Sequence, residues 1–309
     1  LTTSAPPPPG TTGELTLTLT PFAGAVRAHV TEAGKAAAAL RYEVPGVLPP
    51  DLGTAWGGAW GPGSTAPKAT GAGGAGRAAL ALPASAGGGW VTVGYAPFSL
   101  ALHLGAGPPP APDAIPAMSF NGGGFLDMQP LRLGGPGENE TWVETWKGHT
   151  DARPRGPQAV TFDLTFPGGA TLYGLPERAA PAALRPTAGP DPAFGTGGGA
   201  GNSNASETEI KAEPYRLYNL DVFEYEADSN FGLYGSIPAI IAHSPDGGSA
   251  AASSAGDKKG KGKEKAGGGA PASPTTVGAL WLNAAEMWVD LLRPAGPAGP
   301  AETRWIAEA

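Results

Sequence analysis

Apolar and polar residues alternate along several short stretches of this chain, and Val160–Phe166 shows the alternation most clearly. In a strand of this sequence the apolar side chains would share one face, while Thr161, Asp163 and Thr165 would share the other. This pattern is typical of an antiparallel sheet that packs on one side and meets water on the other. We therefore predict a β-strand at Val160–Phe166 whose polar face is solvated.

Similar short patterns recur between glycine and proline signals, so we predict many short strands. They fall at Leu15–Thr20, Gly24–Glu32, Leu40–Val44, Ala78–Leu82, Trp90–Leu104, Arg216–Tyr225, Ala239–His243, Gly278–Asn283 and Met287–Leu292. Met118–Met128 predicts two strand ends joined by a glycine turn, and Trp142–Asp151 predicts a short helix or an irregular crossing. Many short strands without a long amphipathic helix or a repeat predict an all-β fold, an antiparallel β-sandwich.

Glycine and proline determine the expected domain organisation, because they contribute 50 and 35 of the 309 residues and cluster between the predicted strands. Segments of this composition bury too little apolar surface to offset the cost of ordering their backbone. We expect a disordered tail at 1–13 and a single β-sandwich domain over 14–309, with long disordered loops near 57–89, 178–210 and 245–274. The last loop is lysine-rich, and we interpret it as an enlarged hairpin tip, since lengthening a loop adds little closure entropy.

Charge and composition exclude several classes of function. The net charge of −7 argues against nucleic acid as a partner, because binding phosphates requires a basic surface. There is no cysteine, and the four histidines lack the spacing of a zinc site, so we expect no metal ion and no cofactor. No run approaches the roughly 18 apolar residues of a membrane span. Trp281 and Trp288 could stack on a sugar, but aromatic side chains in strands more often belong to the core.

The segment Glu213–Glu226, which reads EPYRLYNLDVFEYE, contains the first candidate for chemistry, Asp221, close to Glu224, Glu226 and Asp228. A retaining glycosidase needs two carboxyl groups about 5–5.5 Å apart, and nothing in this spacing fixes such a pair. The spacing also lacks the alternate-ligand pattern and the central glycine of a calcium loop. The residues alone therefore favour a solvated strand edge or turn over a catalytic or cation site.

Four motifs in a fixed order resemble a known family. They are LYGLPE at Leu172–Glu177, YRLYNLDVF at Tyr215–Phe223, LYGSIP at Leu233–Pro238 and WLNAAE at Trp281–Glu286. Together they resemble the N-terminal β-sandwich of glycoside hydrolase family 31, most closely that of the catalytic α subunits of glucosidase II. The resemblance implies a galactose-mutarotase-like supersandwich. It also implies hydrolysis of α-linked glucose from N-glycans by a retaining mechanism, with the catalytic carboxylates in a following barrel domain.

The 309 residues do not contain that barrel, so we expect no catalytic residue here and no activity from this chain alone. The resemblance implies that the domain supports the barrel and forms part of the rim of its glucose pocket. There Asp221 would bind sugar hydroxyls, with Asn219 as a weaker second candidate. A carboxylate suits this task, because it accepts hydroxyl donors in charge-assisted hydrogen bonds. Two alternatives remain: a stand-alone carbohydrate-binding or interaction module, which needs an exposed aromatic platform, and a purely structural sandwich.

The resemblance also implies partners and a location. The substrate would be a glucosylated N-glycan or an α-glucoside, and a noncatalytic β subunit would be a protein partner. The location would be the lumen of the endoplasmic reticulum, although the chain shows no signal peptide. Two Asn-X-Ser/Thr triplets, at Asn204 and Asn139, are candidate N-glycosylation sites in that compartment.

Overall fold

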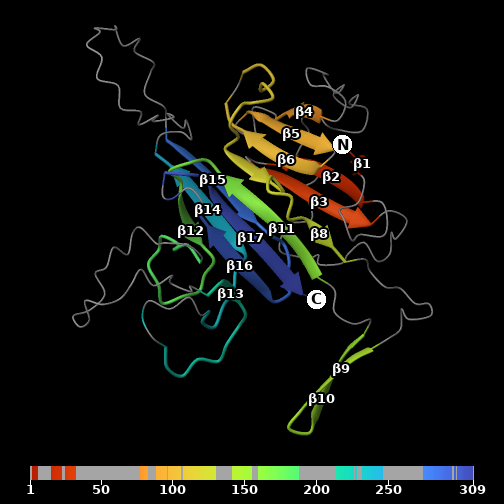
Figure 1. Ribbon diagram of the computed structural model, residues 1–309, viewed down its shortest axis with the longest axis vertical. Coiled ribbons are helices and arrows are strands. Elements are labelled where there is room, and N and C mark those ends of the chain that lie inside the picture. The colour runs from red at the N-terminus through yellow and green to blue at the C-terminus, as the bar shows by residue number, and fades with distance from the viewer. Residues whose placement is uncertain are drawn as a thin grey trace.

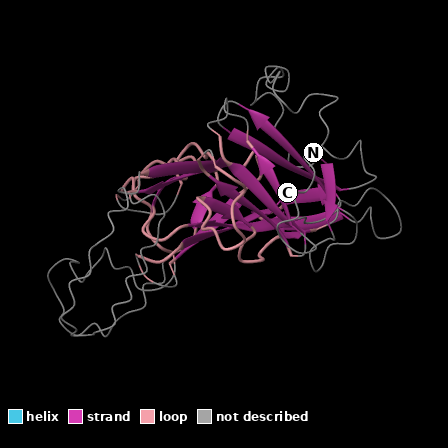
Figure 2. Ribbon diagram, turned by 90° about the horizontal axis from the view of Figure 1, so that it is seen from above, coloured by secondary structure: helices cyan, strands magenta, loops and turns pink. Residues whose placement is uncertain are grey.

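The computed structural model describes residues 2–5, 15–22, 25–32, 77–82, 88–95, 97–105, 107–129, 141–154, 159–187, 213–225, 227, 232–245, 274–293, 296 and 298–308. These residues form seventeen β-strands. They contain no helix, as Figure 2 shows. The all-β fold that the alternating patterns predicted is therefore confirmed.

The strands have the following bounds in chain order. They are β1 (Thr2–Ala5), β2 (Leu15–Phe22), β3 (Ala25–Glu32), β4 (Arg77–Ala81), β5 (Trp90–Tyr95), β6 (Phe98–His103), β7 (Met118–Phe120), β8 (Asp127–Met128), β9 (Thr141–Trp146), β10 (His149–Pro154), β11 (Ala159–Phe166), β12 (Thr171–Gly174), β13 (Tyr215–Leu217), β14 (Ala239–Ser244), β15 (Thr275–Leu280), β16 (Met287–Leu292) and β17 (Ala301–Glu308). Nearly all the predicted strands are present, and Leu40–Val44 lies outside the described residues.

The largest sheet has nine strands in the order β13-β16-β17-β11-β7-β6-β5-β4, with β8 also paired to β11 (Figure 1). Two smaller sheets have the orders β12-β14-β15 and β1-β2-β3, and β9 and β10 form a separate hairpin. Every pairing among the described strands is antiparallel. The topology is therefore that of an antiparallel β protein built around one broad sheet.

One face of the large sheet carries the hydrophobic core along its whole width. Leu164 of β11 lies opposite Phe120 of β7, which lies opposite Leu100 of β6. Directly opposite residues on neighbouring strands share a face, so these side chains point the same way. Leu164 belongs to one hydrophobic cluster with Leu172 of the β12-β14-β15 sheet, and Leu100 to another with Leu19 of β2. The two small sheets thus form the second layer of a sandwich.

The lysine-rich insertion joins two strands that pair with each other. Ala239 of β14 lies opposite Leu280 of β15, and the ladder continues to Ser244 opposite Thr275. The interpretation of 245–274 as an enlarged hairpin tip agrees with this register. The strand expected at Gly278–Asn283 is shifted, however, because β15 occupies Thr275–Leu280 and ends before Trp281.

The expectation of a short helix or an irregular crossing at Trp142–Asp151 is wrong. This segment lies in a β-hairpin in which Trp146 of β9 pairs with His149 of β10. The two residues between them, Lys147 and Gly148, have φ angles of 48° and 82°. Two-residue hairpin turns of type I′ require positive φ at both positions, and glycine adopts it without strain. The Lys-Gly pair is thus a turn signal that the hydrophobic pattern of this segment does not reveal.

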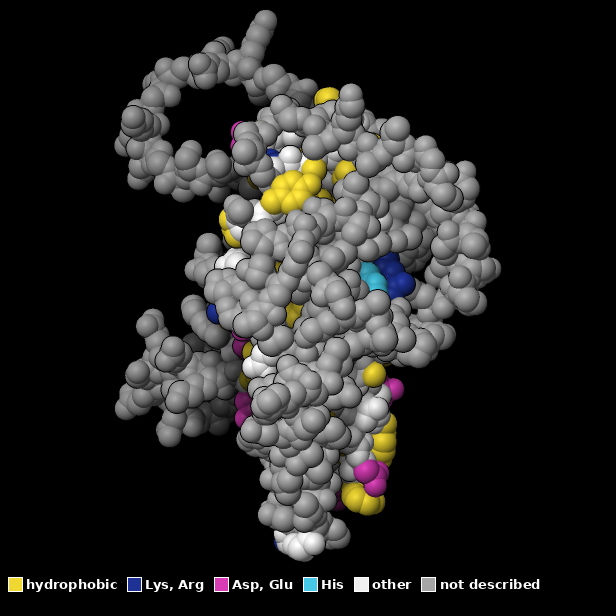
Figure 3. Space-filling view, turned by 90° about the vertical axis from the view of Figure 1, so that its right-hand side faces the viewer, with side chains coloured by type: hydrophobic (Ala, Val, Ile, Leu, Met, Phe, Trp, Pro, Cys, Tyr) yellow, Lys and Arg dark blue, Asp and Glu magenta, His cyan; other side chains and the backbone are white. Residues whose placement is uncertain are grey.

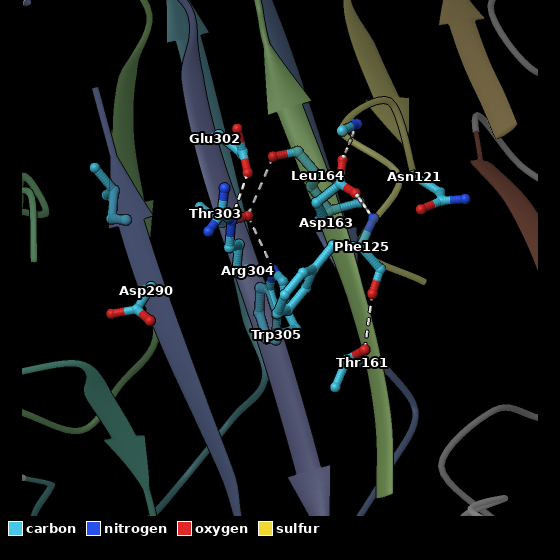
Figure 4. Close-up of polar contacts among 12 residues, drawn as sticks. Asn121, Phe125, Thr161, Asp163, Leu164, Asp290, Glu302, Thr303, Arg304 and Trp305 are labelled. Carbon is cyan, nitrogen blue, oxygen red and sulfur yellow. Dashed lines mark hydrogen bonds and ion pairs between the residues drawn. The ribbon is translucent and has the colours of Figure 1, made fainter. Parts of the chain in front are cut away.

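The polar face of β11 is only partly solvated, because a loop covers Asp163 at its centre while Thr161 and Thr165 stay partly exposed. The side chain of Asp163 is 0% exposed. Its carboxylate accepts the backbone N–H groups of Gly123 at 2.8 Å and of Phe125 at 2.9 Å (Figure 4). On the same strand Thr161 Oγ1 donates to the carbonyl oxygen of Phe125 at 2.7 Å. The glycine turn between β7 and β8 therefore folds back over the sheet and is held by these side chains.

Candidate functional site

Two of the four motifs run side by side at the end of the β12-β14-β15 sheet. β12 ends at Gly174, and the next residue, Leu175, donates its N–H to the carbonyl oxygen of Ala239 at 2.8 Å. Two residues further on, the N–H of Glu177 donates to the carbonyl oxygen of Gly235 at 2.9 Å. The LYGLPE turn therefore lies against the LYGSIP segment that leads into β14.

Further hydrogen bonds connect the LYGLPE turn, through LYGSIP, to the YRLYNLDVF motif. The Glu177 carboxylate accepts the N–H of Gly235 at 3.0 Å, and the Glu177 carbonyl accepts the N–H of Leu233 at 3.1 Å. The Leu233 carbonyl in turn accepts the N–H of Leu220 at 3.0 Å. Figure 1 shows the green segment after β12 next to the teal loop after β13. A continuous series of contacts thus leads from Glu177 to the residue before Asp221.

The strand expected at Arg216–Tyr225 is much shorter in the structure. β13 covers only Tyr215–Leu217, which pair with β16, and the chain then leaves the sheet as an irregular loop. The prediction fails beyond Leu217 because the loop follows no neighbouring strand and is held by individual contacts. One is the Leu220 bond, and another is the Tyr234 hydroxyl, which donates to the carbonyl oxygen of Val222 at 2.5 Å. The residues on both sides of Asp221 are therefore fixed.

Asp221 itself lies exposed on this loop, and so does Asn219. Neither side chain makes a hydrogen bond or an ion pair with any residue that the structure describes. The carboxylate oxygens of Asp221 are thus available to external donors, on a backbone that is held in place. Glu224 is exposed as well, whereas Glu226 lies outside the described residues, as do Asp228 and the two candidate glycosylation sites Asn139 and Asn204.

Exposed aromatic side chains lie close to Asp221 in the sequence, and another bonds to its neighbour Val222. Phe223 is 93% exposed and Tyr225 65% exposed on the same loop, and Tyr234, which bonds to Val222, is 59% exposed. The prediction from the motif named the acids of this segment and missed its aromatics, although YNLDVFEYE contains both. Hydrophobic and acidic side chains also lie next to one another at the lower right of the face drawn in Figure 3.

The base of the loop is braced by Arg216 of β13. Its guanidinium donates to Glu286 Oε1 from Nη2 at 2.8 Å and from Nε at 3.0 Å. It also lies over the ring of Tyr218, 4.6 Å from the centroid, and 5.8 Å from the ring centroid of Trp288. Glu286 ends the WLNAAE motif, so this ion pair brings the fourth motif to the same loop.

A second arginine supports the other side of β13. The Arg178 guanidinium lies 4.8 Å from the ring centroid of Tyr215 and donates from Nη2 to the carbonyl oxygen of Arg216 at 3.4 Å. Burial lowers the pKa of Arg178 to about 10, and the neighbouring Tyr215 acts in the opposite direction. Tyr215 is buried, and its hydroxyl donates to the Arg185 carbonyl oxygen at 3.0 Å. The start of the loop is therefore anchored to the core.

Trp281 of the WLNAAE motif and Trp288 of β16 pack against neighbouring side chains. Trp281 meets the ring of Phe162 edge-on with centroids 4.6 Å apart, and the ring of Trp305 at 6.2 Å. It packs against the main hydrophobic cluster, in line with the preference for a core role over a sugar platform. Trp288 is partly buried next to the Arg216 guanidinium.

Metal-ligating side chains do not gather in the part of the chain that the structure describes, where no group of three or more His, Asp or Glu could hold an ion. His243 Nδ1 instead lies 2.9 Å from Thr276 Oγ1, and His103 Nε2 lies 3.4 Å from Thr92 Oγ1. Among the described residues no helix is long and apolar enough to cross a membrane. The loop around Asp221 is the strongest candidate for a binding site among the described residues, because its carboxylate is exposed and the residues on both sides of it are held by hydrogen bonds.

Comparisons with known proteins identify the kind of domain that carries this loop. The model of the glycosyl hydrolase 31 N-terminal galactose mutarotase-like domain matches residues 85–252. A probable glucan 1,3-alpha-glucosidase of Oryza sativa subsp. japonica is 40% identical over 226 residues, which cover 71% of this chain and 19% of that protein. The neutral alpha-glucosidase AB of Homo sapiens is 31% identical over 187 residues, covering 55% of this chain and 14% of that protein.

Solved structures give the same result. The chain resembles the crystal structure of a DNJ-bound glucosidase II alpha subunit with a TM-score of 0.57 and 25% identity, over 96% of this chain and 28% of that one. It also resembles the ER glucosidase II heterodimeric complex of a catalytic subunit with the binding domain of its regulatory subunit, with a TM-score of 0.55 and 26% identity, over 96% of this chain and 28% of that one. The chain thus spans a fifth or less of the length of the curated relatives named above, 19% and 14%.

Proposed function

Since the chain belongs to glycoside hydrolase family 31 through its N-terminal galactose mutarotase-like domain, we propose that it is the front domain of an α-glucosidase of the glucosidase II type. The activity would be hydrolysis of α-linked glucose from N-glycans by a retaining mechanism. That mechanism uses two carboxyl groups about 5–5.5 Å apart, one as nucleophile and one as acid and base, and we assign both to a barrel domain outside these residues.

The observation that carries this proposal is the exposed carboxylate of Asp221 on a loop whose neighbouring residues are fixed on both sides. A carboxylate on a backbone that is already held can accept sugar hydroxyls without the loop first having to be ordered, which lowers the entropic cost of binding. Asn219, exposed two residues earlier, could add a further polar contact. The role of this chain in catalysis is therefore to bind and orient the terminal glucose.

The aromatic neighbours of Asp221 extend the same argument. Ligand sites combine a few placed polar groups with apolar and aromatic surface. Phe223 and Tyr225 offer ring faces on the loop, and Tyr234 adds a third ring beside it. These rings also supply the exposed aromatic platform that a stand-alone carbohydrate-binding module requires, so that function is our second candidate.

The relatives support a proposal for the partners and the location. One solved relative is an ER glucosidase II complex of a catalytic subunit with the binding domain of a regulatory subunit. We accordingly propose a noncatalytic β subunit as a partner, the endoplasmic reticulum lumen as the location, and a glucosylated N-glycan as the substrate. Asn204 and Asn139 would be the glycan acceptors of this chain in that compartment.

The first test is the mass of the native polypeptide. An antibody raised against residues 213–226 would be used to blot source extract after deglycosylation. A band far above 30.8 kDa supports the glucosidase, whereas a band at that mass would favour the stand-alone module.

The second test is kinetic, in the full-length polypeptide. Asp221→Ala is expected to raise KM for an α-1,3-linked glucose disaccharide about tenfold or more, the effect of losing hydrogen bonds to a charged group, with thermal unfolding unchanged. Asp113→Ala, at an exposed aspartate between β6 and β7, is the control. Unchanged kinetics for Asp221→Ala would remove this residue from the site.

A further inference from the structure

Glu177 makes three hydrogen bonds to one short segment of the LYGSIP motif. Its N–H donates to the Gly235 carbonyl at 2.9 Å, its carboxylate accepts the Gly235 N–H at 3.0 Å, and its carbonyl accepts the Leu233 N–H at 3.1 Å. The bond to the Glu177 carboxylate thus adds to the two bonds made by the Glu177 backbone. Leu233 and Gly235 are therefore held from the Glu177 side at three points.

Residues 233–235, which Glu177 holds, in turn contact the loop that carries Asp221. The Leu233 carbonyl accepts the Leu220 N–H at 3.0 Å, and the Tyr234 hydroxyl donates to the Val222 carbonyl. Leu233 and Tyr234 thus contact the residues immediately before and after Asp221. Any movement of residues 233–235 would be passed to both sides of Asp221.

Because residue 235 is a glycine, the Glu177 carboxylate can approach its backbone N–H closely enough to bond to it. A Cβ atom on Gly235 would lie 3.1 Å from the Glu177 carboxyl carbon and 3.3 Å from its Oε1, which is tighter than ordinary contact. Gly232 has a similar role three residues earlier, because a Cβ there would lie 3.2 Å from the carbonyl oxygens of Arg216 and Tyr218. Both glycines permit close approach of the segment to its two supports.

From these contacts we infer that Glu177 is a positioning residue, whose carboxylate clamps residues 233–235 and so fixes the Asp221 loop for sugar binding. This inference rests on the proposed function of Asp221. Glu177 touches no reacting atom in this arrangement, and it acts only through the backbone of its neighbours. Substitution of Glu177 should therefore reduce the order of the loop and the affinity for substrate, with little change in the rate of the chemical step.

The test compares Glu177→Ala, which removes the acceptor, with Glu177→Gln, which keeps an oxygen acceptor without the charge. Amide hydrogen exchange of Leu220 and Leu233 is measured in the chain, with Asp113→Ala as a remote control. We expect exchange at both amides to rise severalfold in the Ala variant, because the segment that carries Leu233 loses its bond to the carboxylate, and much less in the Gln variant. Unchanged exchange in the Ala variant overturns the inference.

Sugar affinity is then measured in the full-length polypeptide with an α-1,3-linked glucose disaccharide. The Ala variant should raise KM severalfold at nearly constant kcat, and the Gln variant should restore most of the affinity. If exchange rises in Glu177→Ala while KM stays constant, and Asp221→Ala raises KM, the positioning role is overturned and the proposed function survives. If Asp221→Ala leaves KM unchanged, the proposed function fails, and the positioning role for sugar binding fails with it.

Discussion

Asp163 of β11 accepts the backbone N–H of Gly123 at 2.8 Å with its side chain completely buried. A second oxygen of the same carboxylate accepts the N–H of Phe125 at 2.9 Å. One charged side chain in the middle of the sheet thus holds the turn between β7 and β8. The contact spans 40 residues of sequence, so it ties the turn to the core.

Replacing this carboxylate should destabilise the fold strongly. Asp163→Ala leaves two backbone donors without their acceptor, and we expect the free energy of unfolding to fall by about 2–5 kcal/mol. Urea denaturation measures the change. Asp113→Ala, at an exposed site, should stay within about 0.5 kcal/mol of the wild type. Equal losses in the two variants would contradict the assigned role of Asp163.

Gly174 at the end of β12 is predicted to tolerate no side chain. Its φ is 121°, and a Cβ atom would collide with the carbonyl oxygen of Ala239. Gly174→Ala should therefore lower the free energy of unfolding by about 3 kcal/mol or more, since strain and clash add. Gly124→Ala is the matched control, because Gly124 has a φ of 75° but open space around it, and its cost should be nearer about 1 kcal/mol. Thermal or urea unfolding of the two variants side by side measures the difference.

His103 should make stability depend on pH. Burial, and secondarily the positive charge of Arg77, lower the pKa of His103 below its ordinary value of 6.5. As the pH falls below that value the unfolded chain takes up the proton first, so the free energy of unfolding decreases until the folded pKa has been passed. Above about pH 7 this contribution is fully present. Urea midpoints between about pH 5 and 7 should show the decrease.

Two variants test whether His103 causes this pH dependence of the urea midpoints. His103→Leu removes the titrating group, so its urea midpoints should vary less over the same pH range. Arg77→Gln removes the second cause and should move the pKa of His103 back toward 6.5, which reduces the pH dependence in part. A pH dependence in His103→Leu as steep as that of the wild type would assign the effect to other groups.

The Arg216–Glu286 pair should contribute modestly, because both side chains are partly exposed. A double-mutant cycle of Arg216→Gln and Glu286→Gln is expected to give a coupling of about 0.2–1 kcal/mol that shrinks with added salt. Arg216→Lys keeps the charge but loses the planar contact with Tyr218, so it should still cost stability. A cycle in which the coupling is independent of salt would contradict an ionic origin.

Most strands could be predicted because their alternation is local. β11 and β16 each have apolar side chains at every second position, and β14 begins with a short apolar run. β17 was missed although its burial also alternates, because Ala301–Glu308 is rich in alanine and glutamate, which favour helices. β1 (Thr2–Ala5) lies within the segment 1–13 that we expect from its composition to be a disordered tail, and β12 (Thr171–Gly174) is too short, at four residues, to show a pattern.

The candidate site was predictable only in part. The motif YRLYNLDVF pointed to Asp221 through resemblance, and its exposure fits that role. The sequence could not predict that Glu177 contacts Gly235, because 58 residues separate them and the contact depends on the path of the backbone. The burial of Asp163 was hidden for the same reason: the turn that covers it begins 40 residues earlier in the chain.

β17 has a consequence for how the molecule is made. It pairs with β16 on one side and with β11 on the other, and the sheet order joins β13 and β16 to the remaining strands through it. Translation proceeds from the N-terminus, so residues 301–308 leave the ribosome after every other strand described here. Until then β16 and β11 lack the strand that joins them in the sheet. If the earlier strands form during synthesis, the edges that later pair with β17 are open to chaperones and to misassembly.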